Sequence, residues 1–123
     1  MKPFVIALTC ALALAPPGMA QSAAAPYPVE RLSRVMGELH AIQFICQGPD
    51  AQVWRERMSE LLDLEAPVRG PYRQRLISEF NDGFAERQRA RPRLLCGEDT
   101  QRLERRLAEE GERLSERLRR TYL

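Results

Sequence analysis

The side chains best suited to nucleophilic or metal chemistry are few: one histidine, His40, and three cysteines, Cys10, Cys46 and Cys96. A thiol protease needs a free cysteine beside its histidine, and a zinc site needs several such ligands together. No nucleophile-elbow, zinc-protease, phosphate-loop or dinucleotide-binding motif occurs in the sequence. We therefore expect His40 to be a packed or hydrogen-bonded helix residue, and we expect no metal and no cofactor.

Carboxylates are plentiful, and Glu60, Asp63 and Glu65 lie within two helical turns. A glycoside hydrolase needs two carboxylates facing each other across a cleft, and this spacing gives no such arrangement. A solvent-exposed helix face accounts for these three carboxylates.

The function that we favour below is binding without catalysis. A cell-wall (peptidoglycan) hydrolase or transferase is the first alternative to it, and a thiol-redox or metal-binding protein is the second.

After Lys2 every basic residue is an arginine, and the net charge is only +2. Four of these arginines alternate with other residues, so in an extended segment they would all point the same way: Arg87, Arg89, Arg91 and Arg93. Guanidinium groups bind carboxylates and phosphates bidentately, so this basic strip could contact lipid head groups or an acidic partner. A solvated linker is the other interpretation. Without interleaved aromatic residues the strip does not predict nucleic-acid binding.

The first twenty residues have the parts of a secretory signal peptide. Lys2 is followed by an uncharged run over residues 4–15, and small residues precede a cleavage position after Ala20. The run is too short for a transmembrane anchor, so we do not expect an integral membrane protein. We expect a signal peptide at 1–20, a short flexible leader at 21–27, a single helical domain at 28–123, and a periplasmic location.

Removal of the signal peptide also removes Cys10 and leaves Cys46 and Cys96, about fifty residues apart. In an oxidising compartment an isolated pair of this kind predicts one disulfide, whereas redox dithiols usually have the close C-x-x-C spacing. In the chain-entropy model such a bond stabilises the fold by roughly 4 kcal/mol.

Apolar residues spaced three and four apart predict an all-α fold, a small four-helix bundle-like domain stapled by the disulfide. Pro28 begins the first helix and Gly48 ends it, while Gly70 precedes the third and the fourth follows Pro92. The first helix is expected to bury one amphipathic face. Gly83, inside the third helix, predicts a kink or the close approach of another backbone.

The last helix carries an eleven-residue repeat whose leucines form a nearly straight stripe: Leu103, Leu107, Leu114 and Leu118. Docking on the other three helices accounts for this stripe. A homodimer or a partner helix is the alternative, because both flanks of the stripe are charged.

Several short motifs occur in a particular order: Gly37-x-x-His40 running into Cys46, Trp54-Arg55 with Met58, Glu65-x-Pro67, Phe80-Asn81-x-Gly83-Phe84, Cys96, and Glu110-Gly111 before Tyr122. In this order and spacing the chain resembles a family of small secreted alphaproteobacterial proteins, classed as a domain of unknown function. The resemblance covers about residues 27–122. It implies a periplasmic location and a disulfide, and it implies no established activity.

These observations together predict a non-catalytic binding or envelope-associated accessory protein. We expect its partner to be an unknown envelope protein or an anionic surface. The polar residues of the family-like motifs are the candidate binding surface: His40, Arg55, Asn81 and Asp82. The core beneath the disulfide is expected to contain Trp54, Met58, Phe80 and Phe84.

Overall fold

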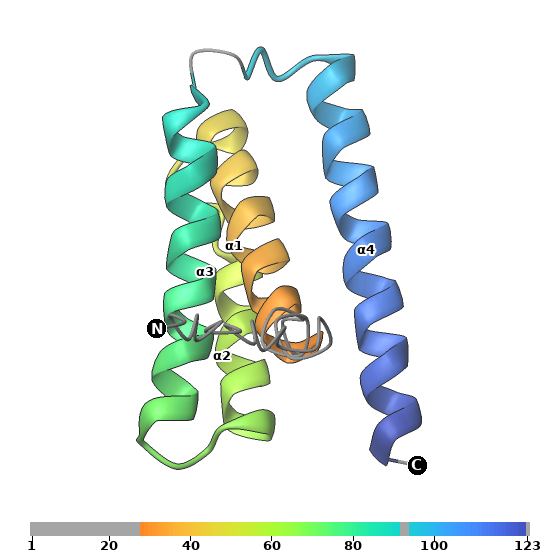
Figure 1. Cartoon of the computed structure of the whole chain (residues 1–123). Coiled ribbons are helices and arrows are strands. Elements are labelled where there is room, and N and C mark those ends of the chain that lie inside the picture. Colours follow the sequence, from red (N-terminus) through yellow and green to blue (C-terminus); the bar gives the residue numbers. More distant parts are fainter. Residues whose placement is uncertain (1–27, 92–93, 123) are drawn as a thin grey trace, which may run out of the picture.

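A computed structural model describes residues 28–91 and 94–122, which form four α-helices and no strand. The helices are α1 (Pro28–Gln47), α2 (Val53–Glu65), α3 (Pro71–Arg89) and α4 (Glu98–Tyr122), and they run alternately up and down (Figure 1). The all-α prediction is confirmed. The expected signal peptide, which contains Cys10, and the expected leader at 21–27 lie outside the described residues, as does Arg93.

The helix ends follow the glycines and prolines of the sequence. Gly48 has a φ of 99°, a left-handed conformation that other residues rarely adopt, and its N–H donates to the carbonyl of Phe44 at 3.1 Å. Pro71 occupies the first turn of α3, where its missing N–H has no helical partner to lose. None of the described helices has both the length and the hydropathy needed to span a bilayer.

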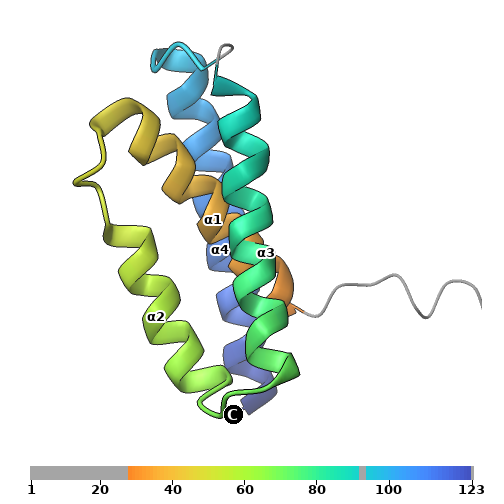
Figure 2. The same cartoon turned by 90° about the vertical axis from the view of Figure 1, so that its left-hand side faces the viewer.

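Helix α1 lies at the centre and packs against each of the other three helices (Figures 1 and 2). Every residue from 35 to 42 is buried, which includes Glu38 and His40. The expectation of one buried face is therefore wrong for the middle of α1. Because α2, α3 and α4 cover different sides of this helix, its polar positions are enclosed along with its apolar ones.

Two glycines bring the backbones of α1 and α3 into direct contact. A Cβ atom added to Gly37 would lie 2.0 Å from the carbonyl oxygen of Phe80, and one added to Gly83 would lie 2.3 Å from that of Arg34. Helix α3 continues through Gly83. Of the two structures predicted at Gly83, the close backbone approach is the one present.

Helix α4 docks on α1 through its leucine stripe. Leu107, Leu114 and Leu118 are buried, and Leu103 packs against the same core. A two-pronged ion pair joins the helices: Arg31 donates from Nε and Nη2 to the carboxylate of Glu110 at 2.7 and 3.2 Å. Intramolecular docking of the stripe is confirmed, and a homodimer through the same face would have to displace α1.

The predicted Cys46–Cys96 disulfide is present, with 5.6 Å between the Cα atoms. It joins the end of α1 to the segment that leads into α4. The α1–α4 contact is thereby fixed by a covalent bond at one end and by the leucines along its length. Of the four residues expected in the core, Met58 and Phe80 are buried, while Trp54 and Phe84 are half-buried.

Candidate functional site

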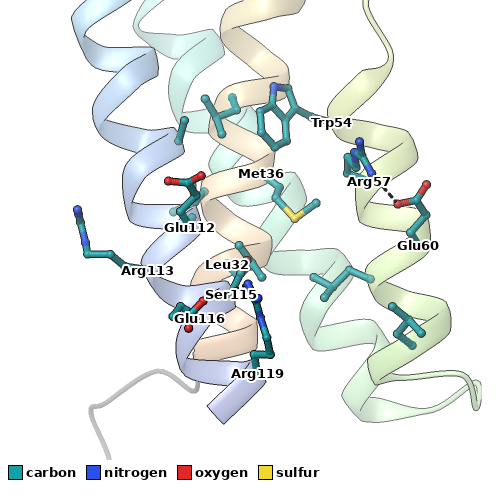
Figure 3. Close-up of a pocket in the computed structure, with 16 residues that line it drawn as sticks. Leu32, Met36, Trp54, Arg57, Glu60, Glu112, Arg113, Ser115, Glu116 and Arg119 are labelled. Atoms are coloured by element: carbon teal, nitrogen blue, oxygen red, sulfur yellow. Dashed lines mark hydrogen bonds and ion pairs between the residues drawn. The ribbon is translucent and has the colours of Figure 1, made fainter. Parts of the chain in front are cut away.

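An open groove of about 710 Å³ lies over α1, between α2 and α4 (Figure 3). We call it the α2–α4 groove. Its floor is apolar and comes from α1: Leu32, Val35, Met36 and Leu39. The α2 wall carries large apolar side chains, Trp54, Leu61 and Leu64, whereas the α4 wall carries small residues, Ala108, Gly111 and Ser115.

The groove exists because α2 and α4 each pack on α1 without closing on one another. Helix α2 is anchored by Met58 and Leu62, which are buried, so that Leu61 and Leu64 project from its neighbouring face. On α4 the small residues recur three and four positions apart, and therefore share one helix face. With little side-chain volume on that face, the space above α1 stays unfilled.

Charged side chains line both edges of the groove, and each edge holds an ion pair within its own helix. On α2, Arg57 lies 3.3 Å from Glu60, and on α4, Arg119 lies 3.0 Å from Glu116. Figure 3 shows the α2 pair beside the groove. Each edge therefore presents both signs of charge and is close to neutral.

Trp54, the one tryptophan of the chain, lies in the groove wall with its ring beside Met36 (Figure 3). Its Nε1 is shielded from solvent and has no hydrogen-bond partner among the described residues. Leu64, farther along the same wall, is 80 % exposed. Most isolated surface leucines need no explanation, but one at the mouth of an apolar groove extends a continuous apolar surface.

His40 does not contribute to a surface, which corrects its place in the predicted binding surface. It is 6 % exposed, and its ring centroid lies 5.7 Å from that of Phe80 and 5.3 Å from that of Phe84. Burial, followed by the charge of Arg55, lowers the pKa of His40. Its Nδ1 is buried without a hydrogen-bond partner among the described residues. The arrangement matches the expected packed histidine.

The other three members of the predicted surface, Arg55, Asn81 and Asp82, are exposed. Arg55 belongs to α2, while the other two belong to α3. None of the three lines the α2–α4 groove. Their role in binding stays a prediction.

The basic strip is not extended at its beginning. Arg87 and Arg89 lie in the last turn of α3, where residues two apart point to nearly opposite sides. Arg87 turns inward to Glu38, with 3.5 Å between Nη2 and Oε1, whereas Arg89 and Arg91 are exposed. A single face carrying all four arginines would require the extended backbone that this segment lacks at its first two positions.

Glu38 is the most enclosed carboxyl group among the described residues, at 3 % exposure. Burial raises its pKa above the ordinary 4.5, although Arg87, Arg31 and Arg34 oppose this effect and Glu86 adds to it. Neither its Oε2 nor the Nε of Arg87 has a hydrogen-bond partner among the described residues. The ion pair is therefore incompletely satisfied, and holding the carboxylate charged opposes folding.

Replacing this carboxylate by an amide should change how stability depends on pH. A carboxyl group whose pKa is raised on folding binds more protons in the native state, so its contribution to stability falls as the pH rises above 4.5. Relative to Glu38→Gln, the wild-type protein should lose stability as the pH rises above 4.5. Urea unfolding at several pH values measures this difference. A wild-type stability that rises relative to that of Glu38→Gln as the pH rises above 4.5 would contradict it.

The carboxylates considered for hydrolysis do not face one another across a cleft. Glu60 is paired with Arg57, and Asp63 lies 3.8 Å from Arg73. Across residues 28–91 and 94–122, no three His, Cys, Asp or Glu side chains come together in a way that could hold a metal ion.

The groove was not predicted from the sequence. The available signal was the small-residue face of α4, together with the apolar positions of α2 that the core does not need. Periodicity shows that such faces exist, but it does not show whether two of them border the same empty space.

The fold and the groove define a class: a disulfide-bonded, all-α protein with an open apolar groove that has charged edges. Residues 26–122 match the family described as "Protein of unknown function (DUF2385)", and the chain belongs to this family. The match agrees with the resemblance to a domain of unknown function. No curated protein matches the chain. A search of the solved structures likewise found no match.

Proposed function

We propose that this chain is a non-catalytic binding protein of the cell envelope, and that it holds an apolar part of its partner in the α2–α4 groove. The open groove carries the proposal, with the exposed Leu64 and the half-buried Trp54 and Leu61 along its α2 wall. Binding sites typically combine such a surface with a few polar groups that fix orientation. Here the ion pairs on the two edges are those groups.

Two features of the chain support a periplasmic location. The first twenty residues have the charge, hydropathy and small-residue pattern of a signal peptide that ends at Ala20. The Cys46–Cys96 disulfide suits an oxidising compartment. On this proposal residues 21–27 are a short leader, and the working protein is the helical domain that begins at residue 28.

The groove, rather than the exposed polar residues of α2 and α3, is the surface that we expect a partner to cover. Arg55, Asn81 and Asp82 are exposed polar side chains, for which water is an adequate partner. Leu64, which is 80 % exposed, gains more from coverage, because each square ångström of apolar surface removed from water contributes about 25 cal/mol.

Crosslinking in intact producing cells tests this proposal. A benzophenone amino acid at position 64 should give a discrete photo-adduct. The same group at position 95 should give none, although Leu95 is equally exposed at 86 % and lies away from the groove. We expect at least a tenfold difference in adduct yield. Equal yields at both positions, or no adduct at position 64, would contradict a groove-based binding function.

A further inference from the structure

We propose that the partner on the groove side of α2 is a second copy of this chain, and that the two α2 helices pack antiparallel across a two-fold axis. This inference rests on the proposed function and names its partner. It is carried by the exposed apolar residues of α2, by their spacing along the helix, and by the order of the charges between them.

Helix α2 lies to one side of the other three helices and packs mainly on α1 (Figure 2). Val53, at its first turn, is 53 % exposed, and Leu64, at its last turn, is 80 % exposed. No other described helix carries two large apolar side chains with such exposure. Together they form an apolar surface that the described part of the chain leaves uncovered.

Val53 and Leu64 share one face of α2 with the ion pair of Arg57 and Glu60. The four residues are spaced four, three and four positions apart, and residues with this spacing lie along one side of a helix. We call these four residues the α2 outer face. Three of them, Arg57, Glu60 and Leu64, also line the groove. The face is about 16 Å long at 1.5 Å per residue.

The spacing of the α2 outer face is the same when it is read from either end, so the face is complementary to itself. With the two-fold axis between residues 58 and 59, Val53 lies opposite Leu64 of the partner subunit. Arg57 then lies opposite Glu60 of the partner subunit. An isologous interface requires such self-complementarity, because both subunits use the same surface.

The Arg57–Glu60 pair favours one direction of packing. Nη1 of Arg57 donates to Glu60 at 3.3 Å, and the two side chains are 63 % and 64 % exposed. A guanidinium group has several N–H donors and a carboxylate has two acceptor oxygens, so each can bind a second partner. An antiparallel dimer therefore adds two opposite-charge contacts at the centre of the interface. A parallel, in-register dimer would instead place like charges opposite each other.

The interface is small, because each subunit contributes one helix of 13 residues. Stable protein–protein interfaces bury about 1,200–2,000 Å² in total, and smaller contacts are typical of transient complexes. Coverage of Val53 and Leu64 supplies the apolar contribution, and the charges at the centre determine the register. We therefore expect a weak dimer whose population depends on protein concentration.

Sedimentation equilibrium of the oxidised chain from Gln21 tests the inference. The average mass should rise from that of a monomer toward that of a dimer up to about 1 mM, because small interfaces associate weakly. Leu64→Glu should weaken association roughly tenfold or more, because it places a charge in an apolar contact. Leu95→Glu is the matched control: Leu95 is 86 % exposed but lies outside the α2 outer face, so association should not change. A chain that stays monomeric, or that associates equally with Leu64→Glu, would overturn the inference.

Charge exchange at the centre of the interface tests the antiparallel register. Arg57→Glu alone and Glu60→Arg alone should each weaken self-association, because each places like charges opposite each other across the axis. An equimolar mixture of these two variants should associate again, since one face is then acidic and the other basic. Recovery in the mixture also shows that both variants are folded. Single variants that associate as the wild type does would contradict the register.

Crosslinking at position 64 in cells separates the failure of this inference from the failure of the proposed function. An adduct with twice the mass of the chain supports the second copy. An adduct with a different protein overturns the second copy and leaves the binding function intact. An average mass that grows beyond a dimer in sedimentation overturns the two-fold pairing, because only a head-to-tail contact continues to add subunits. The proposed function itself fails only if crosslinking at position 64 gives no specific adduct.

Discussion

Gly83→Ala will lower the free energy of unfolding by about 2–3 kcal/mol, even though alanine is the better helix former by about 1 kcal/mol. The added methyl group would lie 2.3 Å from the carbonyl oxygen of Arg34 and 3.2 Å from the backbone nitrogen of Glu38. Backbone atoms of a central helix cannot rotate away as a side chain can. Helices α1 and α3 must therefore separate, and the packing of Phe80 and His40 between them loosens.

Thermal and urea unfolding measure this effect, and the expected fall in melting temperature is about 10–20 °C. Gly37→Ala should behave alike, because its methyl group would lie 2.0 Å from the carbonyl oxygen of Phe80. Gly111→Ala is the matched control, because its nearest contacts are side-chain atoms at 3.8 Å. It should be neutral or stabilising by up to about 1 kcal/mol. A Gly83→Ala protein as stable as this control would refute the close-contact explanation.

Loss of the disulfide should destabilise the protein by about 4 kcal/mol in the chain-entropy model, because the bond joins residues separated by 50 positions. The change is the double substitution Cys46→Ser and Cys96→Ser in the chain from Gln21. Helix α4, which docks mainly on α1, should lose amide protection before the rest of the molecule. Hydrogen exchange and urea unfolding measure the two effects.

Adding a reducing agent to the wild-type protein and to the double variant provides the control for this prediction. The reduced wild-type protein should match the double variant in stability, and the double variant should not respond to reductant. If α4 remains as well protected as α1 and α3 without the disulfide, the leucine stripe and the Arg31–Glu110 ion pair hold it unaided.

The sequence predicted most of the fold because its signals are local. Gly48 and Pro71 mark helix ends through their own backbone geometry, and the leucines of α4 mark a buried stripe through their spacing. The disulfide was predicted by counting the cysteines that remain after removal of the signal peptide. Each of these inferences needs only the residues concerned and a rule about their chemistry.

The burial of His40 and Glu38 and the position of the groove depend on how many neighbours a helix has. A polar residue on α1 is exposed in a helix with one packed face and enclosed in a helix packed on three sides. No local pattern distinguishes these two cases. The groove depends likewise on two helices, α2 and α4, that lie far apart in the chain. Because burial depends on the number of neighbouring helices, the predicted surface included His40, which the structure encloses.

The central place of α1 also bears on the order in which the protein can acquire structure. Helix α1 precedes α2, α3 and α4 in the chain, yet its core contacts are all with those later helices. A chain that emerges N-terminus first therefore exposes Val35, Met36, Leu39 and Ile42 until at least α3 has followed. Folding cannot proceed progressively from that end, and α1 stays vulnerable to aggregation or in need of a holding chaperone until the later helices arrive.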